Sequence, residues 1–253
     1  MLKNLLSIIQ EAGEKMLAYD KPKVYQKEGH ANYVTQADIE VQAFLMDRLS
    51  QAMPEAGFFA EERENEAFGT GPVFVIDPID GTTNFMRGRS CSSISVALLR
   101  DRVPVLGAVL NPYRKELFHA EKGRGAYLNG APIHPSDMPM EKALVNMGTS
   151  PYNALLAGRS MEAAKAFLRE ASDIRRTGSA AIDLCEVACG RSDIYWELEL
   201  SPWDYAAGSL IAAEAGAQVG CPGKGMLSYE RKMAVLAANP LCFKRAEELL
   251  LSV

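Results

Sequence analysis

The sequence predicts an α+β fold in which helices flank an antiparallel sheet and an alternating α/β half follows. Apolar residues recur at helical spacing over residues 2–18 and again between Thr35 and Ala52. Turn signals then divide residues 91–133 into a series of short, β-rich runs. After residue 140, helical and strand patterns alternate, as they do in an α/β layer.

Two helices are expected before the first strand. The first covers residues 2–18; the second begins at Thr35, a good N-cap residue, and ends near Ala52 because Pro54 follows. Residues 19–33 between them are polar and predict a loop. The apolar faces of the two helices consist of Leu2, Leu5, Leu6, Ile9 and Met16 in the first and Val41, Leu45, Met46 and Leu49 in the second.

The strands of the first half are expected to be short. Apolar runs at residues 58–60 and 73–76 each end in acidic residues. The strands that follow are separated by Asp-Arg, Asn-Pro, Gly-Arg and Asn-Gly pairs, which are typical of turns. We expect these later strands at residues 91–99, 103–110, 115–120 and 125–128.

A segment containing Pro132, Pro135 and Pro139 is the predicted domain boundary, because proline interrupts helices and strands. It divides the chain into an N-terminal α+β domain, residues 1–135, and a C-terminal α/β domain, residues 136–253. The elements expected in the second domain are strands at 143–147, 193–197 and 233–238 and helices at 154–171, 179–189, 203–215 and 241–251.

Composition excludes several classes of protein. With 253 residues, of which 48% are hydrophobic and 23% charged, the chain has the composition of a globular protein. Its net charge of −5 argues against direct contact with nucleic acid, so a phosphate-bearing substrate would need an added cation. No apolar run approaches the ~20 residues of a membrane span. The five cysteines show no zinc or redox spacing, which predicts reduced thiols in a cytoplasmic protein.

The most informative segment is an acidic turn after a buried strand, with Asp77 and Asp80 three residues apart. Pro78 keeps Asp77 out of the helical region, so a short turn can hold both carboxylates on one side. Gly81 lets a ligand approach the backbone, and N–H groups near Thr82 can point at an anion. Carboxylate oxygens are the ligands that Mg²⁺ prefers. A turn that only caps the next helix has the same spacing, so both interpretations stay open on this segment alone.

Two further acidic segments are ambiguous when each is taken alone. Glu61 and Glu62 follow the other short strand, which is also typical of a solvated charged loop. Asp204 begins a helix rich in small residues, where an aspartate is usually an N-cap.

The segments Asp77–Phe85 and Trp203–Gly208 resemble the two signature motifs of the inositol monophosphatase family of Mg²⁺-dependent, lithium-sensitive phosphatases. The resemblance runs from about residue 5 to residue 250 in the order and spacing of the family. It implies the layered α-β-α-β-α sandwich of the inositol monophosphatase and fructose-1,6-bisphosphatase type. The other matching segments are Val34–Asp38, Ala60–Glu62, Gly123–Gly130, Arg176–Cys185 and Asp193–Glu197.

The resemblance also implies a metal site and a mechanism. Two to three Mg²⁺ ions are expected, and a metal-activated water would attack the phosphorus in line, without a phosphoenzyme. Thr82 and Asp38 match the pair that accepts the proton in the family, and Glu61 joins them as a catalytic residue. The expected metal ligands are Glu61, Asp77, the carbonyl of Ile79, Asp80 and Asp204.

Substrate contacts follow from the same resemblance. The amides of Gly81 and Thr82 would hold phosphate oxygens, Glu197 would bind substrate hydroxyls, and the backbone of Ser179 and Ala180 would contact the substrate beside it. Two cations are expected near the metals. Lys27 corresponds to a loop lysine of the family. Arg63 departs from the family pattern, in which a small residue is frequent, and is expected to add a charge at the metal entrance and to affect substrate preference.

The implied activity is hydrolysis of inositol 1-phosphate or a related polyol phosphate by a homodimer. Fructose-1,6-bisphosphatase, 3′-phosphoadenosine 5′-phosphate phosphatase and histidinol-phosphate phosphatase share the same core and remain alternatives. A different class of function also stays open, in which the protein is a regulatory binding partner with secondary phosphatase activity. The net charge of −5 means that such a partner would not be nucleic acid contacted directly.

Overall fold

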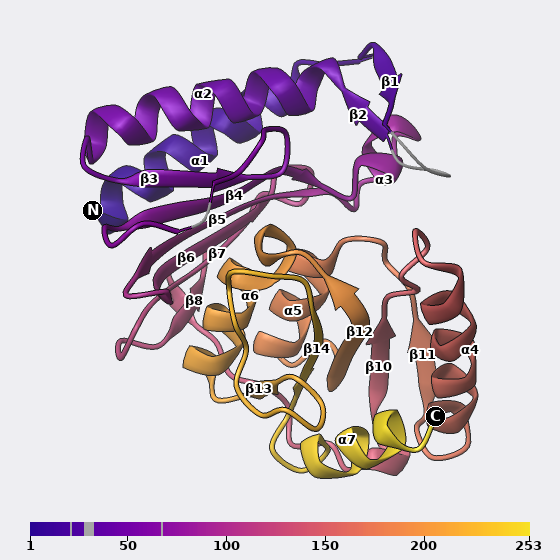
Figure 1. The fold of residues 1–253 in the computed structure, drawn as a ribbon. Coiled ribbons are helices and arrows are strands. Elements are labelled where there is room, and N and C mark those ends of the chain that lie inside the picture. The colour runs from indigo at the N-terminus through magenta and orange to yellow at the C-terminus, as the bar shows by residue number, and fades with distance from the viewer. Residues whose placement is uncertain (21, 28–32, 67) are drawn as a thin grey trace.

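The computed structural model describes residues 1–20, 22–27, 33–66 and 68–253 (Figure 1). Its layers follow the order helices, sheet, helices, sheet, helices, which confirms the predicted α+β sandwich. Separate hydrophobic clusters fill the interfaces between the layers. The central cluster combines side chains from both sheets with those of the helices between them. Among the described residues, no helix is both long and apolar enough to cross a membrane.

The two N-terminal helices are α1 (Leu2–Leu17) and α2 (Gln36–Ala52), as predicted. Thr35 caps α2 in a capping box with Asp38. The expected loop between the helices is wrong in part: β1 (Val24–Gln26) pairs antiparallel with β2 (Tyr33–Thr35). Residues 21 and 28–32 of that loop lie outside the described residues. An exposed strand of three residues that is stabilised by pairing leaves no periodicity that a sequence pattern can show.

The first sheet has seven strands in chain order, β3-β4-β5-β6-β7-β8-β9. The predicted meander is confirmed, but β3 pairs parallel to β4, so the sheet is not wholly antiparallel. The helix α3 (Thr82–Met86) follows β4 directly. The strands are β3 (Gly57–Ala60), β4 (Val73–Asp80), β5 (Ser93–Arg100), β6 (Val103–Asn111), β7 (Glu116–Glu121), β8 (Ala126–Leu128) and β9 (Ala131–Pro132).

The second sheet has five strands in the order β11-β10-β12-β14-β13 and is mixed. Three of its strands were predicted: β10 (Leu144–Met147), β12 (Ile194–Leu200) and β14 (Met233–Ala238). The sequence did not indicate the two edge strands, β11 (Asp173–Arg175) and β13 (Gln218–Gly220). The helices of this half are the short 3₁₀ turn Met140–Lys142, α4 (Ala154–Leu168), α5 (Ala180–Ala188), α6 (Pro202–Ala215) and α7 (Phe243–Leu251).

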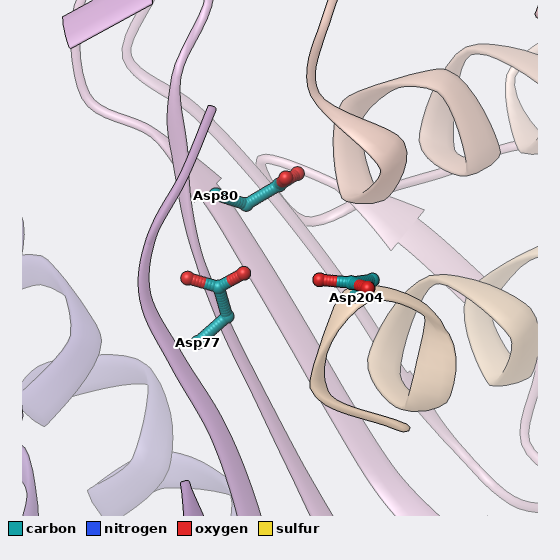
Figure 2. A group of neighbouring side chains, drawn as sticks. All are labelled: Asp77, Asp80 and Asp204. Carbon is teal, nitrogen blue, oxygen red and sulfur yellow. The ribbon is translucent and has the colours of Figure 1, made fainter. Parts of the chain in front are cut away.

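The middle helices lie unusually close to the first sheet. A Cβ atom on Gly107 of β6 would lie 2.9 Å from the carbonyl oxygen of Ala207 in α6, so only glycine permits this approach. A Cβ atom on Gly208 would lie 2.8 Å from Leu184 of α5 in the same way. Small residues therefore let α5 and α6 pack tightly between the sheets, and their N-terminal ends reach the end of β4 (Figures 1 and 2).

Candidate functional site

Three aspartates from two distant segments meet at one point (Figure 2). Asp77 and Asp80 come from the end of β4, and Asp204 comes from the first turn of α6. One carboxylate oxygen of each lies within 4.8 Å of the others. Within the described part of the chain, no lysine or arginine forms a salt bridge with any of the three. Such a group of like charges needs either protons or a bound cation.

The turn between Asp77 and Asp80 is shaped by the local sequence. The pairing of β4 with β5 shifts register between these two residues, which turns both side chains toward the same side. Asp77 accepts a hydrogen bond of 3.0 Å from the backbone N–H of Ile79. Gly81 then adopts a left-handed conformation with φ of 86°, and a Cβ there would lie 3.0 Å from the carbonyl oxygen of Gly178.

Asp204 is held by its own helix end. Its Oδ2 accepts a hydrogen bond of 2.7 Å from the backbone N–H of Ser201, and the two residues form a capping box. The interpretation of Asp204 as an N-cap is wrong, because Ser201 is the N-cap and Asp204 is the N3 residue of the capping box. The same carboxylate also faces Asp77 and Asp80.

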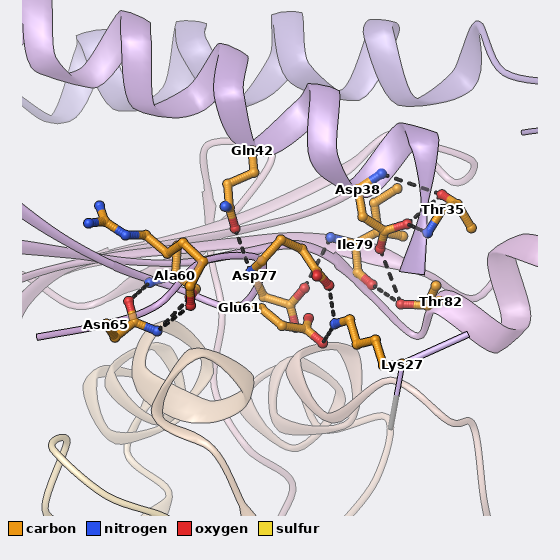
Figure 3. Close-up of polar contacts among 12 residues, drawn as sticks. Lys27, Thr35, Asp38, Gln42, Ala60, Glu61, Asn65, Asp77, Ile79 and Thr82 are labelled. Atoms are coloured by element: carbon orange, nitrogen blue, oxygen red, sulfur yellow. Dashed lines mark hydrogen bonds and ion pairs between the residues drawn. The ribbon is translucent and has the colours of Figure 1, made fainter. Parts of the chain in front are cut away.

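Glu61 lies next to this cluster and is bound to a lysine (Figure 3). The Lys27 Nζ lies 3.3 Å from Glu61 and 2.5 Å from Glu62, so one ammonium group bridges both glutamates. Burial raises the pKa of Glu61 and Lys27 opposes that rise. Glu61 is outside the group of three mutually close carboxylates, but it lines the same cavity.

Thr82 and Asp38 are brought together as the sequence predicted (Figure 3). The Thr82 hydroxyl lies 3.2 Å from Asp38 Oδ1 and 3.1 Å from the carbonyl oxygen of Ile79, so it can donate to either. The other carboxylate oxygen of Asp38 accepts from the backbone and the hydroxyl of Thr35. Burial raises the pKa of Asp38 to about 6, although these hydrogen bonds oppose the rise. The Asp38 carboxylate is therefore a stronger base than an ordinary aspartate, fixed beside the Thr82 hydroxyl.

The electrostatics of the cluster favour a cation. Burial and the neighbouring carboxylates raise the pKa values of Asp77 and Asp204 well above the usual range. Burial also raises the pKa of Asp80 to about 6. The hydrogen bonds described for Asp77 and Asp204 each involve one carboxylate oxygen. An all-oxygen donor set of this kind fits a hard divalent cation such as Mg²⁺.

The comparison with known protein families decides the classification. The model of the inositol monophosphatase family matches residues 1–252. The chain belongs to the inositol monophosphatase family. The resemblance noted in the sequence is thereby confirmed, and the match covers both sheets of the sandwich.

Relatives of the inositol monophosphatase family are similar over most of the chain. The protein is 37% identical over 220 residues to "Inositol monophosphatase 2" of Solanum lycopersicum, covering 83% of each chain. It is 37% identical over 223 residues to "Nus factor SuhB" of Vibrio cholerae, covering 87% of this chain and 83% of the other. The crystal structure of "extragenic suppressor protein suhB" from Bartonella henselae superposes with a TM-score of 0.92 at 33% identity, covering 98% and 97% of the two chains.

In this member of the inositol monophosphatase family, the carboxylates open into a cavity of about 590 Å³. Gly81, Thr82 and Glu197, all predicted substrate contacts, line it. Glu197 accepts hydrogen bonds from the backbone N–H of Ser150 at 2.9 Å and from the hydroxyl of Tyr195 at 3.1 Å. These two donors fix the orientation of a carboxylate that is partly exposed to the cavity.

Ser179 and Ala180 line the same cavity but lie against Asp80. The Ser179 hydroxyl donates to Asp80 Oδ2 at 2.5 Å, and the backbone N–H of Ala181 donates to the same oxygen at 2.8 Å. Hydrogen bonding from the backbone of Ala180 also lowers the pKa of Asp80, against the larger effect of burial.

The expectation for Arg63 is wrong. Arg63 is not among the residues that line the cavity, and its guanidinium donates to the carbonyl of Glu64 instead. Sequence reasoning missed two cations that do line it, Arg176 and Lys232. Arg176 had a signal, because it begins one of the segments that resemble the family. Lys232 had none, since it lies in a polar loop far from every motif.

Proposed function

We propose that the protein is a Mg²⁺-dependent phosphomonoesterase that hydrolyses inositol 1-phosphate or a related polyol phosphate. The observation that carries this proposal is the group formed by Asp77, Asp80 and Asp204. Asp77 and Asp80 are buried and Asp204 is half-buried, and within the described residues no lysine or arginine forms a salt bridge with them. The Thr82–Asp38 pair lies beside them. Names of relatives in the same family point to the same substrate class.

The metal ligands in this proposal are the three aspartates, Glu61 and the carbonyl oxygen of Ile79. Bound Mg²⁺ would neutralise charge on the phosphoryl group and lower the pKa of a coordinated water. Lys27 contacts both Glu61 and Glu62. Glu61 would become a metal ligand once Lys27 pairs with Glu62 alone.

The protein's own groups would position the phosphate and accept a proton. The N–H groups of Gly81 and Thr82 precede the first hydrogen-bonded turn of α3, so no carbonyl within the helix accepts from them, and they can bind phosphate oxygens. Thr82 would accept a proton from the attacking water as its own hydroxyl proton moves to Asp38, which lies 3.2 Å away. No side-chain nucleophile is required, because phosphoryl transfer is mainly positioning and charge stabilisation.

Two measurements test this proposal. Phosphate release from inositol 1-phosphate should rise to saturation with added Mg²⁺ and disappear in EDTA. Acid quenching during turnover of ³²P-labelled substrate should trap no labelled protein. Saturating activity in EDTA would exclude the metal mechanism, and a labelled protein at burst amplitude would replace direct attack by water with a covalent intermediate.

A specific observation favours a bisphosphate as a second candidate substrate. The cavity is lined by Lys27, Lys232 and Arg176. Glu61 and Glu62 neutralise Lys27, and Lys232 lies 3.4 Å from Glu199. For Arg176, by contrast, the described residues offer no carboxylate at salt-bridge distance.

Arg176 lies close to the proposed phosphate loop. A Cβ on Gly178 would lie 3.0 Å from Arg176 Nη1, and Gly178 in turn contacts Gly81 through its carbonyl oxygen. A free guanidinium beside this loop can bind a second anionic group on the substrate. Fructose 1,6-bisphosphate carries such a group, whereas inositol 1-phosphate does not.

The substitution Arg176→Gln distinguishes the two candidates, with Arg175→Gln as its control. Arg175 is the neighbouring arginine, but it pairs with Asp173 on the surface. If a bisphosphate is the substrate, Arg176→Gln should lower kcat/KM for fructose 1,6-bisphosphate by about 10-fold or more, the effect of losing a charged hydrogen bond. Equal small effects of both variants on this substrate would leave inositol 1-phosphate as the better candidate.

The relative named Nus factor SuhB supports a third proposal, that the protein also binds a regulatory partner. Asp77→Asn removes the metal site and keeps the surface, so partners recovered with the wild-type protein should also be recovered with this variant. Loss of every partner in Asp77→Asn would tie binding to the active site instead.

A further inference from the structure

We infer that Ser179 is a positioning residue that orients Asp80 for metal binding and is not a substrate contact. The inference rests on the proposed function, because it assumes that Asp80 binds the cation. The evidence is the set of hydrogen bonds made by the Ser179 hydroxyl and the long separation in sequence between Ser179 and Asp80.

The hydrogen-bonding capacity of the Ser179 hydroxyl is fully used. A serine hydroxyl has one proton and two acceptor positions. Its proton is donated to Asp80 Oδ2 at 2.5 Å. Its oxygen accepts from the backbone N–H of Ile182 at 3.4 Å and lies 3.2 Å from the hydroxyl of Ser93. Ser179 is also 1% exposed, so no position remains for a substrate hydroxyl.

The backbone N–H and carbonyl groups of Ser179 also form hydrogen bonds within the protein. Its N–H donates to the Thr177 hydroxyl at 3.2 Å, and its carbonyl accepts from the N–H of Asp183 at 3.0 Å. Ser179 therefore ends the loop before α5 in a fixed conformation and caps that helix. The groups that it and Ala181 present are directed at a single oxygen of Asp80.

Asp80 differs in this respect from the other two aspartates of the cluster. Asp77 and Asp204 are each held by a backbone N–H two or three residues away in their own segment. Asp80 is held by Ser179 and Ala181, which are 99 and 101 residues away in the chain. The rotamer of Asp80 therefore depends on the packing of α5 against the end of β4.

The hydrogen bond from Ser179 would orient Asp80 for metal binding. Hydrogen bonds that fix one oxygen of a ligating carboxylate orient the other oxygen, and removing such a partner typically weakens metal binding about 10–100-fold. In Asp80 the fixed oxygen is Oδ2, and the carboxylate group faces Asp77 and Asp204. Loss of the Ser179 hydroxyl would free Asp80 to rotate away from them.

Calorimetric titration of the full-length protein with Mg²⁺ tests the inference. Ser179→Ala should bind Mg²⁺ about 10-fold more weakly than the wild type or worse, and Ser179→Thr, which keeps the hydroxyl, should restore most of the affinity. Ser209→Ala is the matched control, because Ser209 is equally buried but bonds to Ala206 and Tyr229 within and beside α6. It should bind Mg²⁺ as the wild type does.

A second variant guards against misfolding of Ser179→Ala. Ser93→Ala removes the hydroxyl that lies 3.2 Å from the Ser179 hydroxyl and 3.5 Å from Oδ2 of Asp80, the oxygen that Ser179 also contacts, and it should weaken Mg²⁺ binding by a smaller factor. Unchanged affinity in both variants would overturn the inference.

Kinetics separate this inference from a role in substrate binding. In Ser179→Ala, KM for inositol 1-phosphate at saturating Mg²⁺ should stay near the wild-type value. A raised KM with unchanged Mg²⁺ affinity would make Ser179 a substrate contact and overturn the inference, while leaving the proposed function intact. A wild-type protein that binds no Mg²⁺ would overturn the proposed function itself.

Discussion

The hydroxyl of Thr82 lies 3.2 Å from a carboxylate oxygen of Asp38, a residue 44 positions earlier in the chain. Thr82 is the first residue of α3, and Asp38 belongs to the first turn of α2. The capping box of Thr35 fixes Asp38, and the carbonyl of Ile79 offers Thr82 a second acceptor. A hydrogen-bonded pathway thus links the end of β4 to a helix of the outer layer.

Replacing Thr82 with alanine should remove this pathway and keep the metal ligands. We expect kcat for inositol 1-phosphate to fall about 10²-fold or more, the usual range for a lost proton acceptor. Mg²⁺ affinity, measured by calorimetry, should change much less. Thr83→Ala is the control, since Thr83 lines the same cavity but is exposed. An unchanged kcat in Thr82→Ala would remove Thr82 from the mechanism.

Asp77→Asn should abolish phosphatase activity and leave the protein folded. The amide has the shape of the carboxylate but not its charge, so a hard cation loses a ligand. In EDTA the variant should also unfold at a higher temperature than the wild type, because burial and neighbouring carboxylates disfavour the ionised form of Asp77. Turnover close to that of the wild type would contradict the metal assignment.

Gly148→Ala should disturb Glu197 without touching the metal site. A Cβ atom at residue 148 would lie 1.8 Å from Glu197 Oε2, so the carboxylate must move. If Glu197 binds substrate hydroxyls, KM for inositol 1-phosphate should rise about 10-fold, the effect of one charged hydrogen bond. Gly158→Ala in α4 is the control, because a Cβ there meets nothing within 4 Å. Similar KM values in both variants would argue against a substrate contact at Glu197.

In EDTA, the protein should become less stable as pH rises from 5 to 7. Burial raises the pKa values of Asp38 and Asp80 to about 6, whereas an unfolded aspartate titrates near pH ~3.9. Between these values the folded state binds more protons than the unfolded state, so its stability falls with increasing pH until about pH 6 is passed.

Thermal unfolding across this pH range measures the effect. The midpoint should drop by several degrees between pH 5 and pH 7, given ~2–4 °C per kcal/mol for a chain of this size. Saturating Mg²⁺ should raise the midpoint most at the high end of the range, because a cation binds the ionised carboxylates. A midpoint in EDTA that rises with pH would show that the carboxylates are not buried as described.

Local patterns predicted most of the fold. The periodicity of α1 and α2 and the turn pairs of the meander placed these elements correctly, because the information lies within each segment. The short strands β1, β2, β9, β11 and β13 were missed. Each has two or three residues, too few to show alternation, and each depends on a partner strand that the sequence does not identify.

In the site too, local patterns predicted contacts within one segment but not contacts between distant segments. The positions of Asp77 and Asp80 follow from the turn that contains them, and the likeness to family motifs joined Asp204 to them. The contact between Ser179 and Asp80 spans 99 residues, so no local pattern indicates it. Arg63 follows Glu62 in sequence and was expected at the metal entrance, but side chains that follow one another on a loop need not face one cavity.

The activity proposed for this protein is hydrolysis of a phosphate monoester at the carboxylates of Asp77, Asp80 and Asp204. The most direct test is phosphate release from inositol 1-phosphate, fructose 1,6-bisphosphate, 3′-phosphoadenosine 5′-phosphate and histidinol phosphate, with Mg²⁺, with EDTA, and with Mg²⁺ plus Li⁺. We predict Mg²⁺-dependent release, greatest from inositol 1-phosphate, abolished by EDTA and reduced by Li⁺. No release from any of these substrates by a folded protein saturated with Mg²⁺ would contradict the claim.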